Sequence, residues 1–408
     1  MRLHPFPALR PTPMLVARVA APPYDIVSRS EAAALATDNP VNFLHVSRAD
    51  IDLPDDVDPH DARIYARARD NLAELVRDGT LVREPEPSLY LYRQATKGDA
   101  RVGVVGCVHV DEYEQGVIKT HETTRPDKED DRTRHMLALD AHAEPVLLAY
   151  RGHAEIDRLG VMGMEVPPLY DFTAVDGVRH TVWRVTHPAP YVDAFREVSG
   201  AYVADGHHRS ASAWRAARAR RAEQTAGAPG AEYEWFPAVL VPAGELRILA
   251  YNRLITDLGG RTWGEVLNLL AKVGRLSPTD DAAPPHPRSF CIYLERRWYV
   301  LELDELSINR ADPVHSLDVA LLQERVLGPV FGIEDQRTDK RIDFVGGIRG
   351  PRELEARVNS GEAAVAVSMF PTAIAELMAV ADAGRMMPPK STWFEPKLLS
   401  GLFIHTFD

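Results

Sequence analysis

The stretch Tyr202–Arg209, Tyr-Val-Ala-Asp-Gly-His-His-Arg, holds the residues best suited to chemistry. An apolar run ends at Ala204, and the Ala- and Arg-rich segment Ser210–Ala222 favours a helix. The residues between them therefore fall where a strand gives way to a helix. A helix N-terminus offers backbone N–H groups and a positive dipole end, which suit phosphate. The predicted phosphate-binding residues are Gly206, His207, His208 and Arg209, and the acid predicted to act in catalysis or hold a metal is Asp205.

A second polar stretch runs from Lys119 to His135 and contains no Ala, Val, Leu or Ile. Pro126 and the acids behind it predict a helix start. The alternative is a solvated, salt-bridged helix, the usual fate of a charge run. The predicted catalytic residues here are His121 and Glu122, and the predicted substrate or phosphate contacts are Lys119, Thr123, Arg125, Lys128 and Arg132.

The tail carries a third polar group, Lys390, Ser391 and Thr392, directly after two prolines. A rigid turn with a Lys and hydroxyl groups could contact a phosphate or a carboxylate. Lys390 and Ser391 are therefore predicted contacts. A purely structural tail that closes a sheet is the alternative.

The bulk composition is that of a globular chain, with 408 residues, 45% hydrophobic and 26% charged. The net charge of −12 argues against broad nucleic-acid binding. No apolar run approaches the ~18 residues of a membrane span, so no membrane association is expected and the cytoplasm is the expected location. Cys107 and Cys291 lie in apolar runs and are predicted to be buried free thiols.

The pattern of apolar residues predicts a mixed α/β (α+β) fold. A buried strand is expected at 42–46, a turn at 111–116, paired strands at 236–241 and 246–251, and a loop at 225–230. The predicted domains are a core at 1–258, an accessory α+β module at 259–361, and a C-terminal segment at 362–408 that packs back on the core. Neither a P-loop nor a dinucleotide fingerprint is present.

Several motifs together resemble one large prokaryotic family, known as domain of unknown function 1015. They are Ala21-Pro22-Pro23-Tyr24-Asp25, Asn39 to His45, Lys119-Thr120-His121-Glu122, Lys128 to Arg132, Ala204 to Arg209, and Lys390-Ser391-Thr392 through Gly401. The Asp-Gly-His-His-Arg box also resembles that of free L-serine kinases, which belong to the ParB/sulfiredoxin-like superfamily. That resemblance implies a ParB-like nucleotide-binding core with a mixed sheet, elaborated by N-terminal strands.

The resemblance further implies a kinase that transfers a phosphoryl group from ATP or ADP, with Mg²⁺, to a free hydroxy amino acid such as L-serine. Gly206 to Arg209 would hold the phosphates and Glu122 would accept the hydroxyl proton. Asp205, then Glu129, would be the metal ligands. The alternatives are a regulatory module that binds or hydrolyses nucleotide, or a metal-dependent hydrolase; a homodimer is left open.

Overall fold

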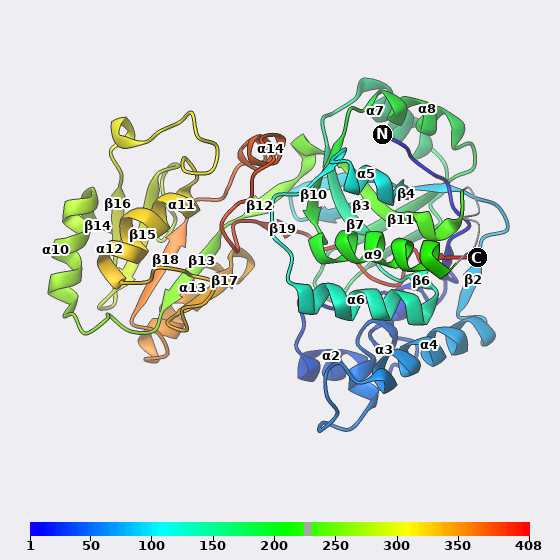
Figure 1. The fold of residues 1–408 in the computed structure, drawn as a ribbon, viewed down its shortest axis with the longest axis horizontal. Helices are drawn as coiled ribbons and strands as arrows, with labels where there is room; N and C mark the ends of the chain where they lie inside the picture. Colours follow the sequence, from blue (N-terminus) through cyan, green and yellow to red (C-terminus); the bar gives the residue numbers. More distant parts are fainter. Residues whose placement is uncertain (224–229) are drawn as a thin grey trace. The chain divides into compact units, whose positions relative to one another are not determined.

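The chain forms two compact units, shown in Figure 1. The computed structural model describes residues 1–223 and 230–408, so the loop predicted at 225–230 lies outside the described residues except for Gly230. The first unit comprises residues 1–120, 124–246 and 396–408, and the second comprises 121–123 and 247–395. The predicted domain boundaries therefore differ from these units, because 247–258 and 362–395 lie in the second unit.

A mixed sheet of eight strands forms the centre of the first unit. Strand β10 pairs parallel with β5 and antiparallel with β7, and β11 pairs parallel with β7 and antiparallel with β4. In spatial order the strands are β5 (Ile118–Lys119), β10 (Ala201–Asp205), β7 (Val146–Tyr150), β11 (Trp235–Pro242), β4 (Asp99–His109), β3 (Leu89–Thr96), β9 (Arg179–Val185) and β8 (Tyr170–Thr173).

Helices cover this sheet, and two of them border the candidate site. Helix α9 packs on β7 and β11 and lies beside α6 (Figure 1). Pro126 stands in the first turn of α6, where its missing N–H costs nothing. The helices of the first unit are α1 (Val16–Val19), α2 (Arg29–Ala36), α3 (Leu44–Ser47), α4 (Ala62–Arg77), α5 (Val110–Glu114), α6 (Pro126–Leu139), α7 (Ala154–Gly163), α8 (Ala189–Glu197) and α9 (His207–Glu223).

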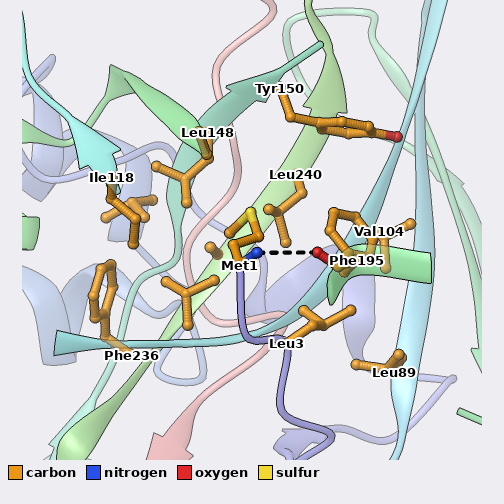
Figure 2. Close-up of a cluster of buried hydrophobic side chains, with 14 of the residues drawn as sticks. Met1, Leu3, Leu89, Val104, Ile118, Leu148, Tyr150, Phe195, Phe236 and Leu240 are labelled. Carbon is orange, nitrogen blue, oxygen red and sulfur yellow. Dashed lines mark hydrogen bonds between the residues drawn. The ribbon is translucent and has the colours of Figure 1, made fainter. Parts of the chain in front are cut away.

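Alternate residues of neighbouring strands build the main core of the first unit, as Figure 2 shows. Leu148 and Tyr150 of β7 lie on the same face as Leu240 of β11, since successive side chains of a strand point to opposite faces. The Met1 ammonium donates a hydrogen bond of 3.1 Å to the carbonyl of Phe195. Burying this apolar face fixes the register of the strands that end at the candidate site.

The second unit is built on an antiparallel sheet of six strands. Its hairpin at 289–302 and its helix at 263–273 agree with the apolar pattern of the sequence. The sheet order is β14 (Arg275–Thr279), β16 (Arg297–Glu302), β15 (Ser289–Leu294), β18 (Val365–Met369), β13 (Tyr251–Ile255) and β17 (Ile342–Gly346), and the helices are α10 (Trp263–Val273), α11 (Asp318–Leu322), α12 (Gly328–Phe331), α13 (Gly350–Asn359) and α14 (Ile374–Asp382).

Short strand pairs complete both units. In the first, the tail returns to the fold through β20 and β6. These pairs are β1 (Leu9–Pro11) with β2 (Leu81–Arg83), β20 (His405–Thr406) with β6 (Ala141–His142), and, in the second unit, β12 (Arg247–Leu249) with β19 (Trp393–Glu395). The mixed α+β class predicted from the sequence is confirmed.

Three local predictions are wrong. The strand predicted at 42–46 is helix α3, whose start is stabilised by the Asn42 side-chain oxygen accepting the N–H of Leu44 at 2.9 Å. The turn predicted at 111–116 is largely helix α5, where His109 acts as the cap. The strands predicted to pair at 236–241 and 246–251 belong to different sheets, because β11 is central and finds its partners in β4 and β7.

Two further features follow from the described residues. Cys107 and Cys291 are buried free thiols, as predicted. None of the described helices combines the length and the hydrophobicity that crossing a bilayer requires.

Candidate functional site

The strand-to-helix turn predicted from the sequence is present. Strand β10 ends at Asp205 and helix α9 begins at His207. Gly206 between them has φ +101°, and a Cβ there would lie 3.0 Å from Val146 Cγ1 and 3.1 Å from Arg209 Nε. A side chain at this position is therefore strained by both conformation and crowding. The Gly206 carbonyl accepts the N–H of Ser210 at 2.9 Å, which is the first turn of α9.

Asp205 holds two cations at this turn. Its Oδ2 accepts a 2.8 Å hydrogen bond from Arg209 Nη2, and its Oδ1 accepts a 3.0 Å bond from Lys397 Nζ. Burial acts to raise the pKa of Asp205, but the charges of Lys397 and Arg209 overcome it and hold the pKa well below its usual range. The three side chains together carry one net positive charge beside the positive end of α9.

The Arg209 side chain is almost completely buried. One terminal nitrogen donates to the carbonyl of Pro145, while Nε has no hydrogen-bond partner within residues 1–223 and 230–408. Burial acts to lower the pKa of Arg209, but the charges of Asp205, Asp25 and Glu144 outweigh it and raise the pKa. The guanidinium is therefore charged and retains one unused donor next to Gly206.

A second buried layer of charge lies behind Arg209. Glu144 accepts the Ser400 hydroxyl at 2.6 Å and the Tyr24 backbone N–H at 3.3 Å, and burial raises its pKa. The Arg132 guanidinium lies 4.1 Å from the centroid of the Tyr24 ring. Sequence reasoning missed Lys397, Glu144 and Tyr24 as site residues. The only signal for Tyr24 was its place in the Pro-Pro-Tyr-Asp motif, and the other two are brought in by tertiary contacts.

The two histidines at the start of α9 act differently. His207 is buried, and burial lowers its pKa to about 4, so it is neutral at pH 7. The Nε2 of His208 accepts the backbone N–H of Arg125 at 3.1 Å. This bond joins the start of α9 to the residue that precedes α6, so the 119–135 stretch from Arg125 onward meets the 202–209 stretch within the first unit.

The predicted contacts on the 119–135 stretch have different surroundings. Lys119 ends β5 beside β10, with Nζ 5.6 Å from the centroid of the Tyr202 ring. Arg125 pairs with Asp127 at 2.7 Å, and Lys128 is exposed on α6. Arg132 is buried and paired with Asp131 at 2.7 Å. The helix face that carries Lys128 and Arg132 is therefore solvated at its start and packed into the fold further along.

Residues 121–123 belong to the second unit, although both flanking residues belong to the first. The His121 carbonyl accepts the Met387 N–H at 2.8 Å, and the Thr392 hydroxyl lies 3.5 Å from His121 Nε2. Glu122 and Thr123 line a cavity of about 470 Å³ within the second unit. The cavity gives the predicted base, Glu122, access to a small molecule.

The predicted contacts in the tail also lie in the second unit. Lys390 is exposed, with its ammonium 5.6 Å from the centroid of the Tyr251 ring. The Ser391 hydroxyl donates to the Pro388 carbonyl at 2.6 Å and is buried. This bond fixes the turn, so the Ser391 hydroxyl has a structural role here.

The two predicted metal ligands are engaged by cations. Both oxygens of Asp205 are bonded to Lys397 and Arg209. Glu129 accepts the Thr124 hydroxyl and pairs with Arg215 at 3.1 Å. Mg²⁺ would have to displace these partners, so this pair of carboxylates does not fit a magnesium site in the arrangement observed.

Several solved structures are similar to this chain. SbnI with C-terminal truncation from Staphylococcus aureus has a TM-score of 0.38 and 15% identity, covering 72% of this chain and 85% of that chain. A conserved hypothetical protein from Pyrococcus furiosus has a TM-score of 0.34 and 14% identity, covering 71% of this chain and 90% of that chain. A free serine kinase in complex with AMP has a TM-score of 0.35 and 14% identity, covering 71% of this chain and 86% of that chain. All three TM-scores are below 0.5, so these likenesses carry no argument about activity.

The family is shown by a different comparison. No curated protein matches the chain. The model of a family described as "Protein of unknown function (DUF1015)" matches residues 3–320, which is more than half of the chain and includes the Asp205–Arg209 turn. The motifs quoted above led to the same family. The chain therefore belongs to the DUF1015 family.

Proposed function

We propose that the protein is a small-molecule kinase that transfers a phosphoryl group from ATP or ADP to the hydroxyl of a free hydroxy amino acid such as L-serine. The observation that carries this proposal is the positive turn at the start of α9, where buried Arg209 keeps one unused N–H beside Gly206. Phosphoryl transfer needs charge neutralisation and positioning more than covalent chemistry.

In this proposal the donor phosphates lie against the first N–H groups of α9. Arg209 is held rigidly by Asp205 and Pro145, so its guanidinium needs no reorganisation when phosphate binds. Lys397 adds a second fixed cation, 3.0 Å from Asp205. A side chain at Gly206 would block the approach of a phosphate to the backbone.

Glu122 is the proposed base. It lies three residues before Arg125, whose backbone N–H donates to His208. Chain connectivity alone limits the Cα separation of Glu122 and Arg125 to about 11 Å. Glu122 takes the proton of the acceptor hydroxyl while that oxygen bonds to the transferred phosphorus. The bond from phosphorus to the bridging oxygen of the donor breaks, and ADP leaves from ATP, or AMP from ADP.

The test is a product assay. Purified protein is incubated with ATP or with ADP and a panel of free hydroxy amino acids, and phosphorylated products are detected by mass spectrometry. Glu122→Gln should abolish the product while ADP still binds, since the carboxamide cannot accept a proton. The exposed Glu165→Gln is the matched control and should leave turnover unchanged.

Two outcomes contradict the proposal. If nucleotide binds but no acceptor in the panel or in a metabolite extract becomes phosphorylated, the regulatory alternative replaces the kinase. If product forms equally with Glu122→Gln, the base is another residue.

A further inference from the structure

Arg253 is a buried cation of the second unit that no described acid neutralises. It lies on β13 and its side chain is fully buried. In the described chain its hydrogen-bond partners are oxygens of neutral groups only, and Nε has none. Its guanidinium carbon lies 5.0 Å from the centroid of the Phe344 ring. Burial lowers the pKa of Arg253 to about 10, which leaves it charged at pH 7.

Two of the groups that Arg253 contacts also line the cavity of about 470 Å³. Its Nη2 donates to Gln336 Oε1 at 3.3 Å and to the Pro389 carbonyl at 3.4 Å. Gln336 and Pro389 both belong to the cavity wall. The positive charge therefore lies one group behind that wall, in a part of the fold from which water is excluded.

A chain of hydrogen bonds continues from Arg253 along the wall. Gln336 accepts from Arg253 through its oxygen and donates through Nε2 to Gln323 Oε1 at 3.2 Å. Gln323 Nε2 in turn donates to the Ile333 carbonyl at 2.7 Å. Because Arg253 can only donate, this order fixes the orientation of both amides. One N–H of the Gln336 amide has no partner within the described part of the chain, and it is polarised by the charge behind it.

A buried charge without a counter-ion is costly, and proteins normally pair such groups. The same charge becomes favourable when an anion occupies the adjoining cavity, because the low dielectric strengthens the attraction. Met386 and Met387 of the wall are adaptable apolar surface that suits a small organic skeleton, and Glu122 can accept from a hydroxyl or an ammonium group. Glu334 and Asp335 also line the cavity, but both are exposed to solvent, and Asp335 is paired with Arg337 at 3.4 Å.

We propose that this cavity binds a small carboxylate, whose anionic group lies at the Gln336–Pro389 wall and is recognised through the charge of Arg253. The claim that this cavity is the acceptor pocket of a kinase rests on the proposed function. The claim that it binds a carboxylate does not depend on kinase activity. Arg253 is then a specificity-determining residue that acts through Gln336.

The test compares the binding of L-serine with that of L-serinamide, in which a neutral amide replaces the carboxylate. The full chain is labelled with ¹³C at the methionine methyl groups, and the signals of Met386 and Met387 are assigned by Met→Leu substitution. Both probes are titrated into wild type, Arg253→Met and Arg337→Met. Arg337 is the matched control, because it also lines the cavity but is exposed and lies 3.4 Å from Asp335.

Wild type and Arg337→Met should bind L-serine about tenfold more tightly than L-serinamide. Binding should change the chemical shifts of the Met386 and Met387 methyl groups. Arg253→Met should lower this ratio to about one, and the swap of a buried charge for an apolar side chain is compatible with folding. Gln336→Leu should have the same effect and serves if Arg253→Met does not fold.

The inference is overturned if neither probe shifts Met386 or Met387, if Arg253→Met and Gln336→Leu keep the preference, or if Arg337→Met loses it. The product assay is read separately. Binding that depends on Arg253 without any phosphorylated product refutes the kinase and leaves the carboxylate site standing. If product forms but Arg253→Met keeps the preference for L-serine, the kinase is supported and the carboxylate site is refuted.

Discussion

Lys397 is the residue whose removal tests the buried charge arrangement most sharply. Its ammonium lies 3.0 Å from Asp205 Oδ1, and both side chains are largely buried. Lys397→Met removes the charge and keeps most of the apolar stem. Among the ion pairs of the described residues, Asp205 would then keep the one with Arg209, at 2.8 Å. Removing one member of a buried ion pair typically costs about 3–5 kcal/mol, and the remaining Arg209 bond favours the lower end, about 3 kcal/mol.

The assay is hydrogen exchange at the β10–α9 turn, which reports this part of the first unit directly. A loss of about 3 kcal/mol predicts roughly a hundredfold faster exchange of protected amides in β10 and the start of α9. Lys390→Met is the matched control in the same tail. Because Lys390 is exposed, its replacement should change stability by no more than about 0.5 kcal/mol.

The sign of the accompanying pH effect follows from Asp205. Its pKa is depressed in the folded protein, so it contributes stability above its unfolded pKa and loses it as the pH falls through the folded pKa. Without Lys397 the pKa of Asp205 in the folded protein rises toward its value in the unfolded chain. The part of the free energy of unfolding that Asp205 contributes, and that is lost in acid, therefore becomes smaller. Equal exchange rates in wild type, Lys397→Met and Lys390→Met would refute the structural reasoning.

Three further predictions concern the same turn. Gly206→Ala should lower the free energy of unfolding by about 1–3 kcal/mol and weaken ADP binding, measured by urea unfolding and calorimetry, because φ is +101° and Val146 is close; unchanged ADP affinity would show that phosphate does not approach here. His207 has its pKa lowered to about 4 by burial, so below its unfolded value near 6.5 the unfolded state binds more protons and stability falls with pH. His207→Gln should remove about 3 kcal/mol of the loss between pH 6.5 and pH 4 in acid unfolding curves, and parallel curves would contradict the buried, neutral His207. Arg209→Lys should reduce ADP affinity at least about tenfold, since Lys cannot reach both Pro145 and Asp205, and full affinity would exclude Arg209 from the phosphate site.

Local sequence signals were enough to predict the central turn. Gly206 follows an apolar run and precedes a segment rich in Ala and Arg, and the change from one pattern to the other locates the start of α9. Pro126 predicts the start of α6 for a similarly local reason. Short apolar runs are less informative: 42–46 fits a strand or a helix equally, and the hydrogen bond from the Leu44 N–H to the Asn42 side chain favours the helix α3.

The rest of the charge arrangement could not be predicted, because it depends on residues far apart in the chain. Lys397 reaches Asp205 across 192 positions, and Ser400 reaches Glu144 across 256. The tail residues predicted as contacts, Lys390 and Ser391, lie in the second unit, whereas Lys397 of the same tail lies in the first. Composition identifies a polar tail, but only the packing of the folded chain selects which of its lysines meets a buried carboxylate.

The most direct test of the central claim is calorimetric titration of the full chain with ADP, run in parallel on wild type, Arg209→Lys and Arg93→Lys, where Arg93 is an exposed residue of β3. If the start of α9 holds the phosphates of a nucleotide, wild type and Arg93→Lys bind ADP alike and Arg209→Lys binds at least about tenfold more weakly. Absence of ADP binding by wild type, or equal affinity in all three proteins, would contradict it.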